Sequence, residues 1–295
     1  WTPVPLDEWS LEAFSLAADP AATNRLLISD YTTLYFSTNG GAAYAARFTA
    51  SDLHVAGVFF DGADIFVGTR AGLLVSTNGG GTFALSAAAG IPGTEAIVSF
   101  AGARQGSARR LFCVTLGSGD VYPSVTGADY GGYRGVYRLD PGPAASWVRC
   151  TNGLGANLPF FVAMAAGNIE TAWLAGATDY PNYPVVFRTG DGGANWTRSL
   201  RVDGNANVRT GWSGDDPGAW NWRKWSYGEC ALGLAVCASD AGRVAITDYG
   251  FVHLTTNGGA TWQAAYAARS DLNPTNTATD KTKPYHGVGL ENTAC

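Results

Sequence analysis

Ser37-Thr-Asn39-Gly-Gly-Ala-Ala-Tyr44 is a short stretch that recurs along this chain and decides its fold. Each copy has a Ser or Thr, then Asn or Asp two residues later, then Gly-Gly, then an aromatic residue. The other copies are Ser76-Thr-Asn78-Gly-Gly-Gly-Thr-Phe83, Thr189-Gly-Asp191-Gly-Gly-Ala-Asn-Trp196, Thr255-Thr-Asn257-Gly-Gly-Ala-Thr-Trp262 and a weaker stretch from Arg138-Leu-Asp140-Pro-Gly-Pro to Trp147. Such repetition indicates one supersecondary unit used several times.

Each residue type in the repeat suits a tight turn between two strands. The Gly pair permits positive φ, and Asn or Asp hydrogen-bonds to the nearby backbone. The Ser or Thr hydroxyl adds a second local bond, and the aromatic ring packs on the side of the turn. We therefore expect a structural role for the turn residues Asn39, Asn78, Asp140, Asp191 and Asn257.

Short apolar runs surround every turn in the same order. Two runs precede it, another lies upstream and a fourth strand follows, as in Leu232–Val236, Val244–Asp248, Phe251–Leu254 and Gln263–Tyr266. Four strands per unit, repeated, predict an all-β chain folded as a β-propeller of four-stranded blades. Five units are clear, and six or seven blades are also compatible with the length. We expect a single propeller domain over residues 1–295, with an insertion over 203–229.

Composition narrows the class of protein. The net charge is −5 and no basic stripe exists, so nucleic acid is not an expected partner. The apolar runs are strand-sized, so no membrane span is expected. The chain begins at Trp1 without Met, which favours a processed extracellular form, secreted or at the cell surface. The three histidines are scattered, and neither a metal nor a cofactor is expected.

The end of the chain and its cysteines leave alternatives open. The stretch from His286 to Cys295 is similar to the opening strand of another blade, so either it closes the ring or the chain continues in a longer polypeptide, which we favour. Cys230 and Cys237 could form a disulfide only if their strand bends back, and several cysteines could simply be buried hydrophobes. The number of cysteines is odd, and Cys295 is the natural candidate for a bridge to another chain.

The repeated turn resembles the Asp-box, or BNR repeat, of a propeller superfamily. Within it, the chain is similar in style to family 74 glycoside hydrolases, the xyloglucanases, and more distantly to sialidases. The likeness to family 74 rests on three segments: Asp30-Tyr-Thr-Thr-Leu-Tyr35, Asp129-Tyr-Gly-Gly-Tyr-Arg134 and Asp248-Tyr-Gly-Phe-Val-His253. The resemblance implies that Asp30 and Asp248 occupy positions like those of that family's catalytic carboxylates. The alternative is that both carboxylates bond to backbone amides at the turns of the blades.

Aromatic and acidic residues concentrate in the insertions. Loops on a rigid scaffold usually carry function, and flat aromatic faces stack on sugar rings while polar neighbours bond to the hydroxyls. The candidate substrate-binding residues are Asp129, Tyr130, Tyr133, Arg134, Trp212, Asp215, Asp216, Trp220, Trp222, Arg223 and Trp225. Alternatively, the tryptophans fill a small core within their own loop, or they form a protein-binding patch.

These patterns predict a secreted propeller that recognises an oligo- or polysaccharide of plant or microbial type. Glycoside cleavage needs two carboxylates, and the pairs available are Asp30 with Asp248, or Asp129 with Asp215 or Asp216, with Glu229 as a further acid. Whether the chain is an enzyme stays open. The alternative function is a non-catalytic structural or interaction propeller, a surface, filament or assembly subunit that self-assembles through Cys295 and the C-terminal strand.

Overall fold

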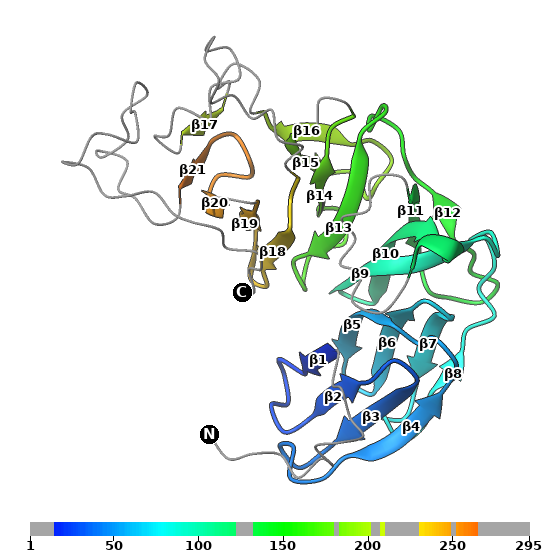
Figure 1. Cartoon of the computed structure of the whole chain (residues 1–295). Helices are drawn as coiled ribbons and strands as arrows, with labels where there is room; N and C mark the ends of the chain where they lie inside the picture. The colour runs from blue at the N-terminus through cyan, green and yellow to red at the C-terminus, as the bar shows by residue number, and fades with distance from the viewer. Residues whose placement is uncertain are drawn as a thin grey trace, which may run out of the picture. The chain divides into compact units, whose positions relative to one another are not determined.

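The structure is a computed structural model that describes residues 15–121, 132–179, 183–201, 207–209, 230–248 and 252–264 (Figure 1). It divides into two compact units, each described by itself. Unit 1 comprises Trp1–Arg104 and Arg109–Arg149, and unit 2 comprises Gln105–Ala108 and Cys150–Cys295. The described residues contain no α-helix and only one 3₁₀ turn, so the all-β prediction is confirmed.

Unit 1 holds three antiparallel sheets whose strands follow one another in chain order. Each sheet has four strands, as the repeat predicts. They are β1 (Ser15–Ala18), β2 (Leu26–Ser29), β3 (Thr33–Ser37) and β4 (Ala45–Thr49); β5 (Val55–Asp61), β6 (Asp64–Thr69), β7 (Gly72–Ser76) and β8 (Ala84–Leu85); and β9 (Glu95–Gln105), β10 (Ala108–Gly117), β11 (Tyr133–Leu139) and β12 (Val148–Arg149).

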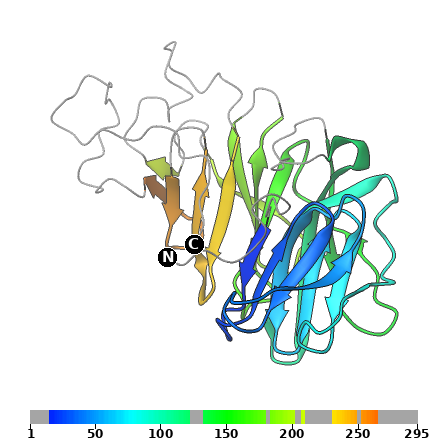
Figure 2. The same ribbon diagram turned by 60° about the horizontal axis from the view of Figure 1, so that its bottom comes forward.

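Unit 2 holds two further sheets (Figure 2). The first contains β13 (Leu158–Met164), β14 (Ala172–Ala177), β15 (Pro184–Thr189) and β16 (Thr197–Leu200), and the second contains β18 (Gly233–Cys237), β19 (Asp240–Thr247), β20 (Val252–Thr255) and β21 (Trp262–Ala264). A short strand, β17 (Val208–Arg209), pairs in parallel with β21. It lies within the segment predicted as an aromatic insertion, so part of that segment extends the sheet.

Apolar side chains between neighbouring sheets form the core of each unit. In unit 1, Leu27, Leu34 and Phe36 of the first sheet pack against Ile65 and other residues of the second. In unit 2, the rings of Trp173 and Trp262 meet edge to face at 6.1 Å, fully buried between the two sheets. Aromatic pairs of this geometry add to the stabilisation that burial gives.

The repeated turns join the third and fourth strands of four sheets and share one bonding pattern. In the first, the Ser37 hydroxyl donates to Asn39 Oδ1 at 2.8 Å and accepts from the Gly41 amide at 3.0 Å. Asn39 Oδ1 also accepts from the Ala43 amide at 3.0 Å. The same bonds recur around Asn78, Asp191 and Asn257. The predicted structural role of these residues is supported by this local network.

Positive φ explains why the repeated turns contain two glycines. Close packing is a further reason for the second glycine in the turn at Asn257. Gly258 and Gly259 have φ of +69° and +83°. A Cβ on Gly259 would overlap Ser199 Oγ and lie 3.0 Å from the Trp173 ring, on the preceding sheet. A Cβ on Gly258 would meet nothing nearer than the Arg188 side chain at 4.0 Å.

The weaker fifth copy forms a different turn. Asp140 follows β11 as predicted, but no hydroxyl stands two residues before it, and its carboxylate pairs with Arg110 Nε at 2.7 Å. The side chain of Trp147 is buried in a core cluster of unit 1, and its amide donates to the Ala89 carbonyl of the preceding linker at 2.7 Å. The same bond occurs in two other sheets, Trp196 to Asn152 at 2.9 Å and Trp262 to Asn207 at 2.8 Å.

Candidate functional site

The order of the strands divides the connections of each sheet between two edges. In an antiparallel sheet of four consecutive strands, the connection between the second and third strands leaves at the same edge as the linker that follows the fourth. We call this the loop edge. The repeated turns lie at the opposite edge, the turn edge. In unit 1, residues 118–132 leave at the loop edge, and in unit 2 so do residues 178–183 and the linker from Arg201 to Leu232. The insertions predicted from sequence therefore share one edge of their sheets.

Asp30 lies at the loop edge of the first sheet and closes the turn between β2 and β3. Its Oδ1 accepts from the amides of Thr32 and Thr33 at 2.7 and 2.6 Å, and its Oδ2 accepts from the Tyr35 hydroxyl at 3.2 Å. Burial alone would raise the pKa of Asp30, but these bonds outweigh it and the pKa is lowered. The carboxylate is half-buried, and it is charged at neutral pH.

Asp248 occupies the same position in the fifth sheet, directly after β19. Its Oδ2 lies 2.7 Å from Nε2 of His253, and both side chains are 0% exposed. The partner stands five residues after the aspartate, as Tyr35 does after Asp30. A substrate cannot touch a carboxylate with no exposed surface, so this geometry favours the structural alternative for Asp248. Because Asp30 and Asp248 belong to different units, the separation that a catalytic pair requires stays a prediction.

Tyr133 and Arg134 are the predicted binding residues that the structure describes, at the start of β11. Tyr133 packs on a small cluster of Ala96, Leu116 and Val121 at the base of the first insertion. Arg134 is exposed, and its guanidinium lies 3.4 Å from the Asp120 carboxylate. Both residues therefore lie at the loop edge, and their part in binding stays a prediction.

The same base is tied to the neighbouring sheet. The Arg70 guanidinium donates to the Ser118 carbonyl at 2.8 Å and pairs with Asp52 at 3.1 Å. The Ser118 amide donates to the Thr94 carbonyl at 2.8 Å. Residues 118–121 thus enter the insertion from a fixed position.

Most of the other predicted site residues lie outside the described residues. These are Asp129, Tyr130, Trp212, Asp215, Asp216, Trp220, Trp222, Arg223, Trp225, Glu229 and Cys295. Their assignments stay predictions. No disulfide joins Cys113, Cys150, Cys230 and Cys237, the cysteines that the structure describes. Within the described ranges, no helix is long and apolar enough to cross a bilayer.

One carboxylate at the loop edge was missed from the sequence. Glu95 opens β9, the first strand of the third sheet, and accepts from the Thr115 hydroxyl at 2.6 Å and the Tyr137 hydroxyl at 3.1 Å. Burial first and Glu95 second raise the pKa of Tyr137 to about 12. No local pattern marks Glu95, because its partners come from strands distant in sequence.

Comparisons with known proteins identify the fold of this chain. No protein-family model and no curated protein matches the chain. Among solved structures, the GH74 xyloglucanase from Xanthomonas campestris aligns over 84% of this chain and 38% of its own, at 19% identity and a TM-score of 0.57. An ancestral GH74 enzyme aligns over 86% of this chain and 31% of its own, at 22% identity and a TM-score of 0.55.

A third structure, the GH74 enzyme of Niastella koreensis, aligns over 85% of this chain and 50% of its own, at 18% identity and a TM-score of 0.49. The chain thus spans half or less of the length of these structures. At these identities the likeness concerns the fold. Together with the five sheets of consecutive antiparallel strands, it identifies the chain as an all-β protein with the β-propeller fold.

Proposed function

We propose that this chain is an extracellular propeller that recognises glycans through the loop edges of its sheets. The observation that carries the proposal is the position of the insertions. All three leave at loop edges, and the sequence places Trp220, Trp222 and Trp225 in the largest one. Aromatic rings beside aspartate and arginine side chains form the usual lining of a carbohydrate site.

The described base of the first insertion supports a pre-formed surface. Arg70, Ser118 and Val121 hold its entry, and Arg134 with Asp120 offers exposed polar groups there. Fixed polar groups can bond to sugar hydroxyls with little loss of conformational entropy. Xyloglucan is the first ligand to examine, because one solved structure of the same fold is a xyloglucanase.

Recognition without hydrolysis is the form of this proposal that the geometry supports best. Asp248 is wholly buried against His253, and Asp30 is engaged by two backbone amides. The hydrolase form still needs a test, and Asp30→Asn and Asp248→Asn provide it. If the purified chain releases reducing sugars from xyloglucan and either variant abolishes that release while keeping its circular dichroism, the hydrolase form holds.

Binding to a polysaccharide panel tests the proposal itself. We expect the chain to bind xyloglucan or another β-glucan, and Trp220→Ala/Trp222→Ala to weaken binding about tenfold or more, since a stacked ring contributes on the order of 1–3 kcal/mol. The control is Leu85→Ala, an exposed apolar side chain on β8, outside the sequence of the predicted insertions. Equal binding by both variants would contradict the proposal.

The alternative is a structural or interaction propeller that assembles through Cys295 and the C-terminal strand. It predicts oligomers that depend on protein concentration and dissociate under reducing conditions. Analytical ultracentrifugation of the chain and of Cys295→Ser separates the two functions. Reductant-sensitive oligomers, together with no binding across the polysaccharide panel, would favour the alternative.

A further inference from the structure

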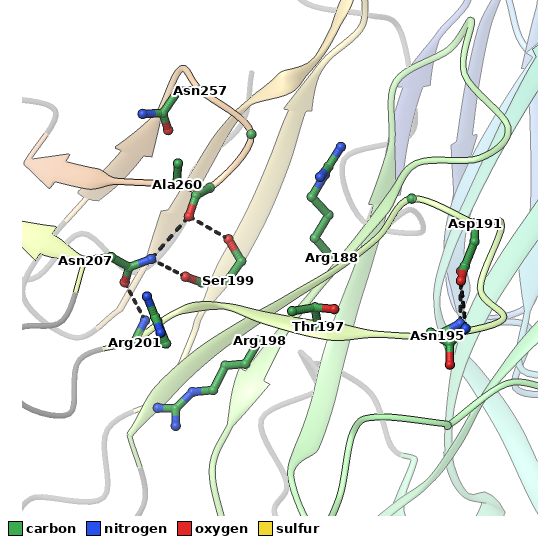
Figure 3. Close-up of a pocket in the computed structure, with 13 residues that line it drawn as sticks. Arg188, Asp191, Asn195, Thr197, Arg198, Ser199, Arg201, Asn207, Asn257 and Ala260 are labelled. Carbon is green, nitrogen blue, oxygen red and sulfur yellow. Dashed lines mark hydrogen bonds between the residues drawn. The ribbon is translucent and has the colours of Figure 1, made fainter.

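A pocket of about 670 Å³ in unit 2 lies between the repeated turns of its two sheets and extends along β16 to Arg201 and Asn207 (Figure 3). The repeated turn around Asp191 forms one side, and the turn around Asn257 on the next sheet forms the other. The end of β15, the start of β16, Arg201 and Asn207, which lies in the segment predicted as an insertion, complete the lining. A volume of this size accommodates a small organic ligand.

Three arginines give the pocket its positive charge, Arg188, Arg198 and Arg201. Arg198 also donates to the Leu200 carbonyl at 3.2 Å. Arg188 and Arg201 both line it and are exposed, and neither forms an ion pair with a carboxylate of the described residues. The Arg188 guanidinium lies 5.7 Å from the centre of the Trp173 ring, which favours one orientation of its side chain. Its charge therefore remains available on a protein whose net charge is −5.

The one carboxylate in the lining is used by its own turn. Asp191 accepts from the Thr189 hydroxyl at 2.7 Å and from the amide and the side chain of Asn195 at 2.9 and 2.8 Å. The Asn195 bonds, the side chain first, lower the pKa of Asp191 to about 2. Asp191 is therefore ionised at neutral pH, and its single negative charge leaves the three arginines of the lining in excess.

The side-chain amide of Asn207 fixes the part of the pocket lining that carries Arg201. Asn207 donates to the carbonyls of Ser199 at 2.5 Å and Gly259 at 3.2 Å, and its Oδ1 accepts from the Arg201 amide at 2.9 Å. Figure 3 shows these bonds linking the outer strand of one sheet to the turn of the next. The backbone that positions Arg201 is therefore fixed by both sheets.

We propose that this pocket binds a saccharide that carries an anionic oxygen group, a carboxylate or a sulfate. Guanidinium groups bind such groups through charge-assisted hydrogen bonds, and the exposed Thr197 in the lining offers a hydroxyl to a sugar. The saccharide part of this inference rests on the proposed function. The pocket itself is a separate site, because its described lining comes from the two repeated turns, β15, β16, Arg201 and Asn207 and includes none of the predicted aromatic residues.

Isothermal titration calorimetry on the full chain tests the pocket with a short oligogalacturonate, a sulfated oligosaccharide, a neutral oligosaccharide of equal length and inorganic sulfate. In Trp220→Ala/Trp222→Ala, which removes the proposed site for neutral glycans, we expect binding of at least one charged saccharide that weakens as salt is raised, and much weaker binding of the neutral one. Arg188→Gln and Arg201→Gln should each weaken the charged ligand about tenfold or more. Arg243→Gln, which removes an exposed arginine outside the lining, should not.

The outcomes separate this inference from the proposed function. Loss of neutral glycan binding in Trp220→Ala/Trp222→Ala, with charged saccharide binding retained, would support two sites. Unchanged binding of the charged saccharide in the Arg188→Gln/Arg201→Gln variant would overturn the pocket. Binding of inorganic sulfate alone, or equal binding of neutral and charged saccharides by Trp220→Ala/Trp222→Ala, would also overturn it.

Discussion

The turn at Gly258 and Gly259 offers a matched pair of substitutions that isolates the packing between two sheets of unit 2. Both residues have left-handed φ, +69° and +83°, so alanine costs backbone strain at either position. Only at Gly259 would the added methyl group overlap Ser199 and press on Trp173 of the neighbouring sheet. The difference between the two variants therefore reports the fit of one sheet against the other.

The expected magnitudes follow from these environments. Gly258→Ala should lower the free energy of unfolding by about 1 kcal/mol, the cost of the left-handed conformation for a residue with a Cβ. Gly259→Ala adds an overpacking cost of about 1–3 kcal/mol, because the clash is with a buried wall that cannot move freely. We expect a total of about 3 kcal/mol for Gly259→Ala.

Equilibrium urea denaturation of both variants measures the difference. Intrinsic tryptophan fluorescence is a suitable signal, since Trp173 and Trp262 lie buried in contact near this turn. Far-UV circular dichroism of the native variants controls for a change in fold. Equal losses of stability for Gly258→Ala and Gly259→Ala would refute the packing of these two sheets as described.

Two further predictions concern aspartates with opposite burial. Asp248→Ala should lower the free energy of unfolding by about 3 kcal/mol or more, because it leaves buried His253 without its carboxylate partner. Urea denaturation measures this loss of stability, and a loss below about 1 kcal/mol would contradict the prediction. Hydrogen bonds in the folded chain lower the pKa of Asp191 from 3.8 to about 2. The charged carboxylate therefore stabilises the fold above pH 4, and this stabilisation is lost as the pH falls toward 2. In Asp191→Asn, whose side chain matches the other turns, melting temperatures should fall less between pH 4 and pH 2 than in the original chain, and an identical fall would exclude the assignment.

The sequence predicted the sheets well because local chemistry determines them. The Ser or Thr hydroxyl and the Asx side-chain oxygen of each turn bond to residues within the turn, so their pattern is visible in eight consecutive letters. The turn at Asp140 lacks the Ser or Thr hydroxyl of the other copies. The Asp140 carboxylate instead forms an ion pair with Arg110, which is distant in sequence. The sequence did not predict β17, because a strand of two residues that pairs with an outer strand has no local sequence signal.

The candidate sites depend on contacts that sequence does not display. The five-residue spacing from Asp30 to Tyr35 and from Asp248 to His253 is visible in the sequence. The difference in burial between the half-buried Asp30 carboxylate and the fully buried Asp248 carboxylate is not. The partners of Glu95 lie on other strands, and the arginine pocket forms only where two turns from different sheets meet. Such sites follow from packing between sheets.

Hydrogen–deuterium exchange with a neutral xyloglucan oligosaccharide tests the central claim most directly, that glycans bind at the loop edges. Saturating ligand should slow exchange in peptides covering residues 118–134, 178–183 and 210–229. Peptides covering the turn edge, such as residues 189–197 and 255–262, should be unchanged. Protection confined to the turn edge, or no protection with any glycan that the chain binds, would contradict the account.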